Sequence, residues 1–310
     1  MASNKLIDCL PSDLLPDNSA AIYKSLSKKS APRFESLCKV YETLCSRLDG
    51  LPEDVSLIAY STYDPKQLSA IHPGGLNCQV KLCESLLFIF VYTHFYKLKQ
   101  MFQSLNLVLL SRNYLSAGIL SRSAIEHVAF FFYFLRRIED STQKIIQSFK
   151  HAKRGRIDVN QWNKGISQTF YDLFSNLDKA TRGSRYDWSK LHNSFDSSQL
   201  PNSVNVLTCI KELVDRSNFP IDEHYTLFSE MAHPNFGSHT MLIKTRVSVS
   251  DHLSQVVLGE TTNLESSLWF FDMFSEGLDE MVKLSLVSLE RGNNQLNFFK
   301  TISDLCDHNA

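Results

Sequence analysis

Apolar side chains recur at intervals of three and four residues through most of the chain. Between Ala31 and Leu48, for example, they occupy positions 34, 37, 40, 41, 44 and 48. This spacing is typical of a helix that buries one face. Glycine and proline rarely interrupt such stretches, since the chain holds 11 glycines and 9 prolines. The pattern predicts helices over residues 31–48, 79–106, 112–140, 203–216, 222–232 and 251–291.

Two of these helices, over residues 79–106 and 112–140, form the expected centre of the fold. Both are strongly apolar, and the short link between them favours an antiparallel pair. We therefore expect an all-α fold, a helical bundle with long central antiparallel helices and a polar mid-chain loop over residues 178–201. A further helix is predicted to start at Ser141, with Thr142 and Lys144 exposed and Ile145, Ile146 and Phe149 facing inward.

The stretch from Asp49 to Asn77 interrupts the helical pattern. It contains Asp-Gly-Leu-Pro, Tyr-Asp-Pro and His-Pro-Gly-Gly, which are typical of turns and loops. This stretch is the best candidate for a domain boundary. We expect an N-terminal helical extension and cap over residues 1–78 and a helical-bundle core over residues 79–310.

Composition and charge restrict the class of protein. The 310 residues carry a formal net charge of −1, so any contact with RNA would need a local basic patch. The seven cysteines include no Cys-x-x-Cys pair, which fits reduced thiols. No secretory signal is recognisable, and the longest apolar runs are shorter than the ~20 residues that a bilayer requires. We expect a cytoplasmic protein that does not contact a membrane.

Three ionisable residues, Arg122, Glu126 and His127, precede an apolar helical run that ends at Leu135. Burying such groups is costly unless each finds a partner, so they are candidate site residues. Arg122 and His127 also match the loose Arg-to-His spacing of HEPN-type ribonucleases. In those enzymes a histidine moves the proton of the ribose 2′-hydroxyl and an arginine stabilises charge on the phosphate, without a metal. Composition alone makes about one such match expected by chance.

Helical geometry separates the three residues. At about 100° per residue, Arg122 and Glu126 share a face, whereas His127 lies roughly 140° from Arg122. An undistorted helix would not direct both Arg122 and His127 at one phosphate. The alternative to a catalytic site is an Arg122–Glu126 pair that bridges to a neighbouring helix, with His127 hydrogen-bonded in the core.

A second group of polar residues lies further along the chain. Tyr225, Ser229 and His233 recur every fourth residue and so line one stripe of a helix. His233 falls at the helix end, where a cationic imidazole is favoured, and is a candidate catalytic or ligand-binding group. Alternatively, it caps the helix and bonds a carboxylate such as Glu126. Glu230 and His233 match one half of a di-iron motif, but we find no second copy and expect no metal or cofactor.

Arg122-x-x-x-Glu126, followed later by Tyr225-x-x-Phe-Ser229-x-x-x-His233-Pro, resembles a bacterial all-helical family of unknown function that is distantly similar to HEPN-like domains. The resemblance extends over residues 79–237. It implies a helical bundle in a bacterial cytoplasm, encoded near mobile or defence genes, with Arg122, Glu126 and His233 converging between helices. It also implies a homodimer.

Two hypotheses follow for the function. The first is a metal-independent endoribonuclease or toxin-like effector in defence or stress, with Arg122 on the phosphate, His127 or His233 as acid/base and Glu126 orienting the imidazole. The second is a non-catalytic helical interaction or sensor protein, which would contact a protein partner and in which Arg122, Glu126 and His233 form a buried structural network. The first assigns RNA binding to Tyr225, Ser229, Lys150, Lys153, Arg154 and Arg156.

Overall fold

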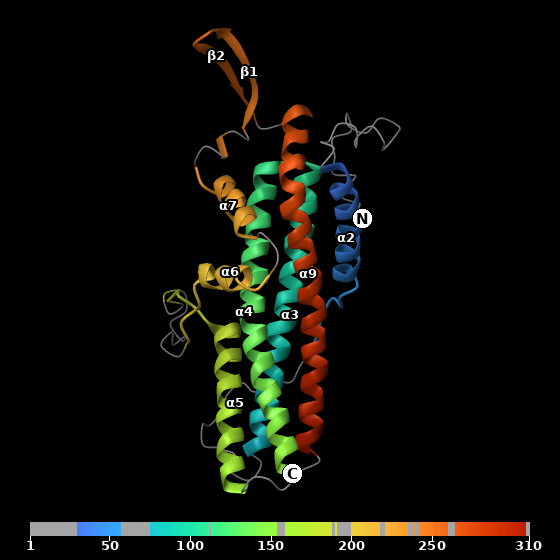
Figure 1. The fold of residues 1–310 in the computed structure, drawn as a ribbon, viewed down its shortest axis with the longest axis vertical. Helices are drawn as coiled ribbons and strands as arrows, with labels where there is room; N and C mark the ends of the chain where they lie inside the picture. The colour runs from blue at the N-terminus through green and yellow to red at the C-terminus, as the bar shows by residue number, and fades with distance from the viewer. Residues whose placement is uncertain are drawn as a thin grey trace. The chain divides into compact units, whose positions relative to one another are not determined.

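The structure, a computed structural model, confirms the all-α class (Figure 1). It describes residues 30–56, 75–111, 113–153, 159–187, 190, 200–217, 221–234, 238–239, 242–259 and 264–307. No helix in these ranges is long and apolar enough to cross a membrane. The helices are α2 (Ser30–Asp49), α3 (Gly75–Leu110), α4 (Tyr114–Lys153), α5 (Val159–Arg182), α6 (Val206–Val214), α7 (Ile221–Ala232) and α9 (Leu264–Asp307).

The two predicted central helices, α3 and α4, are antiparallel, as the short link between them requires. α3 ends at Leu110 and α4 begins at Tyr114. Asn113 caps α4, because its side-chain Oδ1 accepts a hydrogen bond of 3.1 Å from the backbone N–H of Ser116.

The prediction of a new helix at Ser141 is wrong, because α4 continues through this residue to Lys153. Thr142 is also fully buried instead of exposed. Its hydroxyl donates to the carbonyl of Glu139 at 2.9 Å and accepts from the amide of Gln295 at 3.1 Å. Serine and threonine are common at helix starts, but they can also lie inside a helix when the hydroxyl bonds a carbonyl of the preceding turn.

The predicted helix start at Asp251 is also wrong. Residues 243–258 form an antiparallel β-hairpin of β1 (Ile243–Ser250) and β2 (Leu253–Leu258), and α9 begins at Leu264. Four valines, at positions 247, 249, 256 and 257, favour extended backbone because their branched Cβ atoms restrict χ1 in a helix. Asp251 and His252 form the turn between the strands.

The described residues fall into two compact units. One comprises those within Met1–Leu51, Tyr96–Ala129 and Ile210–Val287, and the other comprises those within Pro52–Phe95, Phe130–Cys209 and Ser288–Ala310. Each unit is therefore built from segments that are far apart in the sequence. Helices α3, α4 and α9 contribute residues to both units.

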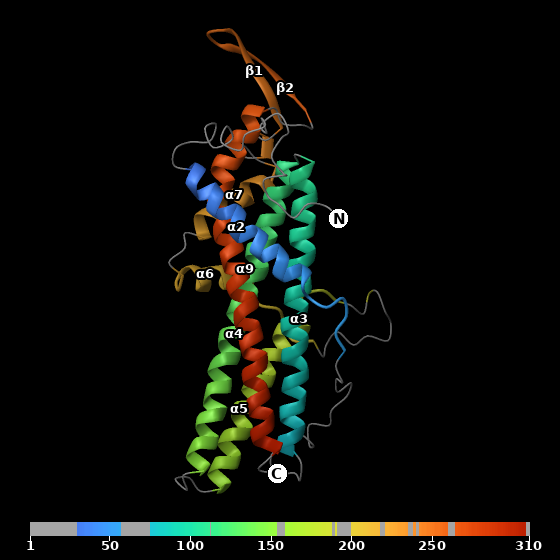
Figure 2. The ribbon, with the colours of Figure 1, turned by 90° about the vertical axis from the view of Figure 1, so that its right-hand side faces the viewer.

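In the first unit, α2 runs at an oblique angle to α3 (Figure 2). Tyr41 of α2 is fully buried and packs edge-on against Phe102 of α3, with ring centroids 5.8 Å apart. Its hydroxyl donates a hydrogen bond to the side-chain oxygen of Asn106. The contact combines apolar burial with a satisfied buried hydroxyl, as the interior of a bundle requires.

In the second unit, His94 of α3 is buried between aromatic and polar neighbours. Its ring stacks on Phe131 of α4 at 3.7 Å between centroids, and its Nε2 lies 2.8 Å from the hydroxyl of Ser288 on α9. Phe131 also stacks on Phe90 at 4.9 Å. α5 covers this unit with one apolar stripe, namely Ile166, Phe170, Leu173 and Leu177.

Candidate functional site

Arg122 and Glu126 lie on the part of α4 that belongs to the first unit. Their side chains are 25% and 27% exposed, so they are half-buried at the helix surface. The second hypothesis expected a buried network, whereas these two members of it are only half-buried. Because water still reaches both groups, the desolvation cost of placing them here is modest.

α7 brings Tyr225, which bonds to both Arg122 and Glu126, to this face of α4. Its buried face consists of Ile221, His224, Phe228 and Met231. Two glycines permit the close approach: a Cβ built on Gly118 of α4 would lie 2.2 Å from the sulfur of Met231, and one built on Gly277 of α9 would lie 2.8 Å from Phe228 Cζ. α7 is therefore packed closely against both α4 and α9.

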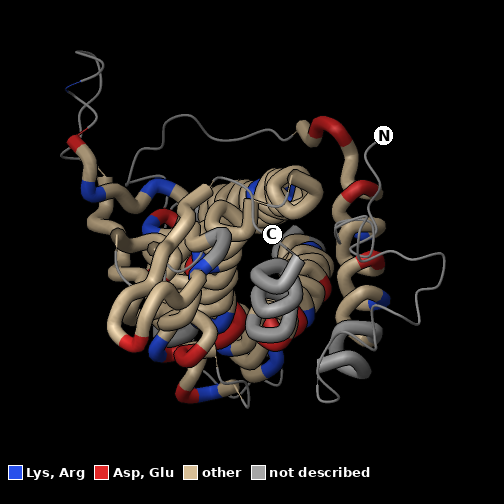
Figure 3. The backbone as a smooth tube through the Cα atoms, turned by 90° about the horizontal axis from the view of Figure 1, so that it is seen from above, with Lys and Arg blue, Asp and Glu red and all other residues tan. Residues whose placement is uncertain are grey.

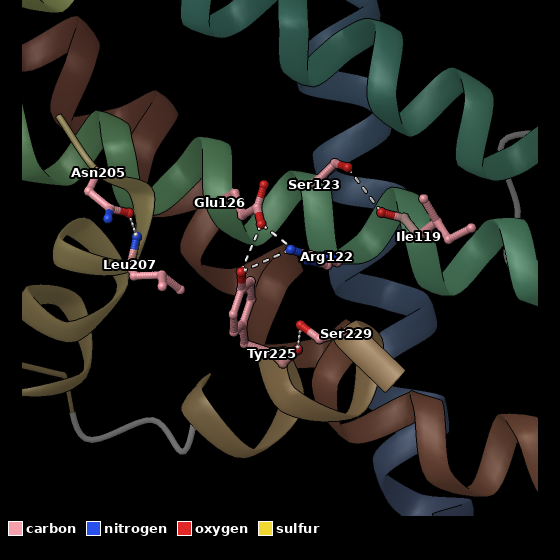
Figure 4. Close-up of polar contacts among 8 residues, drawn as sticks. All are labelled: Ile119, Arg122, Ser123, Glu126, Asn205, Leu207, Tyr225 and Ser229. Atoms are coloured by element: carbon pink, nitrogen blue, oxygen red, sulfur yellow. Dashed lines mark hydrogen bonds and ion pairs between the residues drawn. The ribbon is translucent and has the colours of Figure 1, made fainter. Parts of the chain in front are cut away.

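Three polar side chains meet between α4 and α7 (Figure 4). Glu126 Oε1 accepts hydrogen bonds from Arg122 Nε at 3.1 Å and from the Tyr225 hydroxyl at 2.8 Å. Arg122 Nη2 also donates to the Tyr225 oxygen at 3.3 Å, and its guanidinium carbon lies 5.4 Å from the centre of the tyrosine ring. We call Arg122, Glu126 and Tyr225 the α4–α7 triad.

The electrostatics of the α4–α7 triad favour one protonation pattern. The hydrogen bond with Tyr225 is the largest cause that raises the pKa of Arg122, and the charge of Glu126 adds to it. Burial is the largest cause that raises the pKa of Tyr225; the hydrogen bond from Arg122 opposes this and Glu126 adds to the rise. At neutral pH the guanidinium is therefore charged and the phenol is protonated, as its bond to Glu126 requires.

Ser229 and His233 do not join the α4–α7 triad. The Ser229 hydroxyl donates to the carbonyl of Tyr225 on its own helix at 2.7 Å. The His233 side chain is exposed in the turn after α7, and its backbone N–H donates to the carbonyl of Ser229 at 3.1 Å. Within the described residues, the carboxylate of Glu126 bonds to Arg122 and Tyr225, so the expected contact with His233 is not formed.

His127 is half-buried on α4, where helical geometry places it roughly 140° around the helix axis from Arg122. His233 follows Tyr225 by eight residues, which corresponds to about 12 Å along a helix axis. A histidine and an arginine that act on one phosphate must reach it together. The described geometry does not bring such a pair together.

A polar contact that the sequence analysis missed lies on the other side of α7. His224 Nε2 is 3.3 Å from Glu280 Oε2 of α9, and their side chains are 11% and 13% exposed. The neighbouring Asp279 pairs with Lys283 at 2.6 Å. The helical stripe that His224 shares with Phe228 and Met231 is the signal in the sequence that could have placed it at a helix contact.

The predicted RNA-binding patch is described in part. Lys150 is exposed near the end of α4, and Lys153 is the last residue of that helix. Arg154 and Arg156 lie outside the described residues. Seen from above in Figure 3, both acidic and basic residues lie along the described backbone.

Two buried cysteines are poor nucleophiles. Burial raises the pKa of the Cys45 thiol to about 11, although a hydrogen bond with Asn106 opposes the rise. Burial also raises the pKa of Cys83 well above its ordinary value. Both thiols are therefore protonated at neutral pH. In the parts of the chain with described side chains, no three His, Cys, Asp or Glu residues are placed to hold one metal ion.

The fold and the α4–α7 triad define an all-α helical-bundle protein with a polar contact between two of its helices. No family model, curated protein or solved structure matches the chain. The relationship to HEPN-like domains therefore stays a prediction from the residues quoted above.

Proposed function

We propose that this chain is a non-catalytic helical interaction or sensor protein, and that the α4–α7 triad is a structural contact that holds α7 on α4. The observation that carries the proposal is the shared oxygen of Glu126. Its Oε1 accepts from Arg122 Nε at 3.1 Å and from the Tyr225 hydroxyl at 2.8 Å. Each polar group of the triad is thus paired with another member.

The adjacent residue on α7 supports the same role. His224 reaches Glu280 on α9 while Tyr225 reaches Glu126 on α4. Two successive residues of one short helix therefore make polar contacts with two different long helices. This arrangement fixes the rotation of α7 about its axis, because a turned α7 would break both contacts.

A metal-independent endoribonuclease, with a role in bacterial defence, remains the second candidate. It is favoured by the exposure of Arg122, whose side chain is 25% open to solvent. An arginine with unused N–H groups can stabilise charge on a phosphate. The hydrogen bonds of Arg122 in the described structure go to Glu126 and Tyr225.

Arg122→Ala separates the two candidates. If the triad is a structural contact, Arg122→Ala should lower the free energy of unfolding by about 1–2 kcal/mol. This loss lies between those measured for exposed and for buried ion pairs. A structural contact also predicts that neither wild type nor variant cleaves RNA in the presence of EDTA. The matched control is Arg185→Ala, which removes an exposed arginine and should leave stability unchanged.

If the protein is a ribonuclease, both RNA cleavage and stability should respond in the opposite way. Wild type and Arg185→Ala would cleave RNA in EDTA, and Arg122→Ala would lose cleavage while its melting temperature stayed within a degree or so of wild type. That outcome would overturn the proposal of a structural contact.

A further inference from the structure

In the described part of the chain, β2 pairs with β1 alone, and its outer edge carries no charged residue. All six side chains of Leu253–Leu258 are exposed, including Leu253 at 65% and Leu258 at 67%. None of these residues is charged, and none is proline. Proteins usually protect an edge strand with lysine, proline or a bulge, because free N–H and C=O groups pair readily with another strand. β2 has none of these protections.

β1, the other strand of the hairpin, has both a charged residue and bulges. β1 carries the exposed Arg246, and its register with β2 shifts between Ile243 and Thr245 and again between Ser248 and Ser250. In each shift the extra residue belongs to β1, which is the pattern of a β-bulge. Bulges and charge make the β1 edge a poor template for pairing, so the two edges of the hairpin are not equivalent.

The β2 sequence is complementary to itself when two copies run antiparallel. With a two-fold axis at Gln255, the two Gln255 side chains lie opposite each other, and Leu253 of each copy lies opposite Val257 of the other. Glutamine both donates and accepts, so it can pair with its own copy. The flanking Leu–Val pairs add apolar contact on the same face. No like charges meet in this register.

We propose that the edge of β2 is a homodimer interface, in which two hairpins form a four-stranded antiparallel sheet with a two-fold axis at Gln255. The physical reason is that an isolated two-stranded hairpin is only marginally stable, whereas four strands satisfy more backbone groups. The interface is short, about 20 Å along the strand, so the dimer is weak and forms at micromolar concentrations. This inference does not depend on the proposed function.

Sedimentation velocity on the full chain, from about 1 to about 500 µM, tests the interface. Wild type should change from monomer to dimer over this range. Gln255→Lys and Gln255→Glu each place two like charges at the axis and should weaken the dimer at least about tenfold. An equimolar mixture of the two variants should recover dimer, because lysine then faces glutamate.

The matched control is Val249→Lys, which adds the same charge to an exposed bulge position of β1 and should leave the dimer intact. Circular dichroism should show the same helix content in all variants, since Gln255 and Val249 are exposed. A wild type that stays monomeric overturns the proposal. So does a dimer that survives Gln255→Lys, or that fails to recover in the mixture.

Discussion

The Tyr225 hydroxyl of α7 donates a 2.8 Å hydrogen bond to Glu126 of α4, across 99 positions of sequence. Glu126 is simultaneously the i+4 partner of Arg122 within its own helix. A local ion pair and a long-range contact thus use one carboxylate oxygen.

Removal of the Tyr225 hydroxyl should destabilise the protein without disrupting its core. Tyr225→Phe removes the hydroxyl and leaves the ring in place, so we expect a loss of about 0.5–1.5 kcal/mol. Urea unfolding measures the change. Tyr171→Phe is the control, because Tyr171 is 65% exposed and should contribute nothing measurable. Equal stability of both variants and wild type would show that the contact does not stabilise the fold.

The same hydroxyl should make stability depend on alkaline pH. Burial and Glu126 raise the pKa of Tyr225 above its usual value near 10. The folded state therefore favours the protonated phenol, so this stabilisation is complete below about pH 10 and is lost as pH rises through the folded pKa. The stability difference between wild type and Tyr225→Phe should therefore stay constant up to about pH 10 and shrink at more alkaline pH. A difference that stays constant with pH would contradict this.

Two glycines should respond to alanine with opposite signs. At Gly277, a Cβ would lie 2.8 Å from Phe228 and 3.0 Å from His224, so Gly277→Ala should cost about 1–3 kcal/mol. At Gly165 in α5 nothing lies within 4 Å, so Gly165→Ala should stabilise by about 0.4–1 kcal/mol. Thermal melts of both variants measure the effects. A neutral Gly277→Ala would indicate that α7 is not held closely against α9.

Buried thiols should resist alkylation in the native state. The pKa of Cys45 is raised to about 11 and that of Cys83 is also raised, so their thiolate populations at pH 7.5 are very small. Iodoacetamide should modify both quickly in urea and slowly without it, as peptide mapping by mass spectrometry would show. Cys78 is half-buried and should react sooner in the native protein. Rapid native labelling of Cys45 would contradict its burial.

The positions of α2, α3, α6 and α7 were largely predictable from apolar spacing, because burial of one helical face requires a repeat near 3.6 residues, whereas α5 was not predicted. The predicted helix starts at Ser141 and Asp251 were wrong because the local sequence there is compatible with more than one structure. Ser141 is a residue type that often starts helices, yet α4 continues through it because the neighbouring Thr142 hydroxyl is satisfied internally. The valine-rich residues 243–258 preceded an apolar helical stretch, and the hairpin was missed.

The sequence alone determined that Arg122 and Glu126 share a face of one helix, since the i, i+4 relation is a property of helical geometry. It also placed Tyr225 and Ser229 on one stripe of another helix, with His233 following at its end. Which member of that stripe meets Glu126 was decided only by the tertiary structure. Close packing at Gly118 and Gly277 sets the position of α7, and it places Tyr225 at the carboxylate while His233 stays exposed. That choice depends on contacts between residues far apart in the chain, which local spacing does not encode.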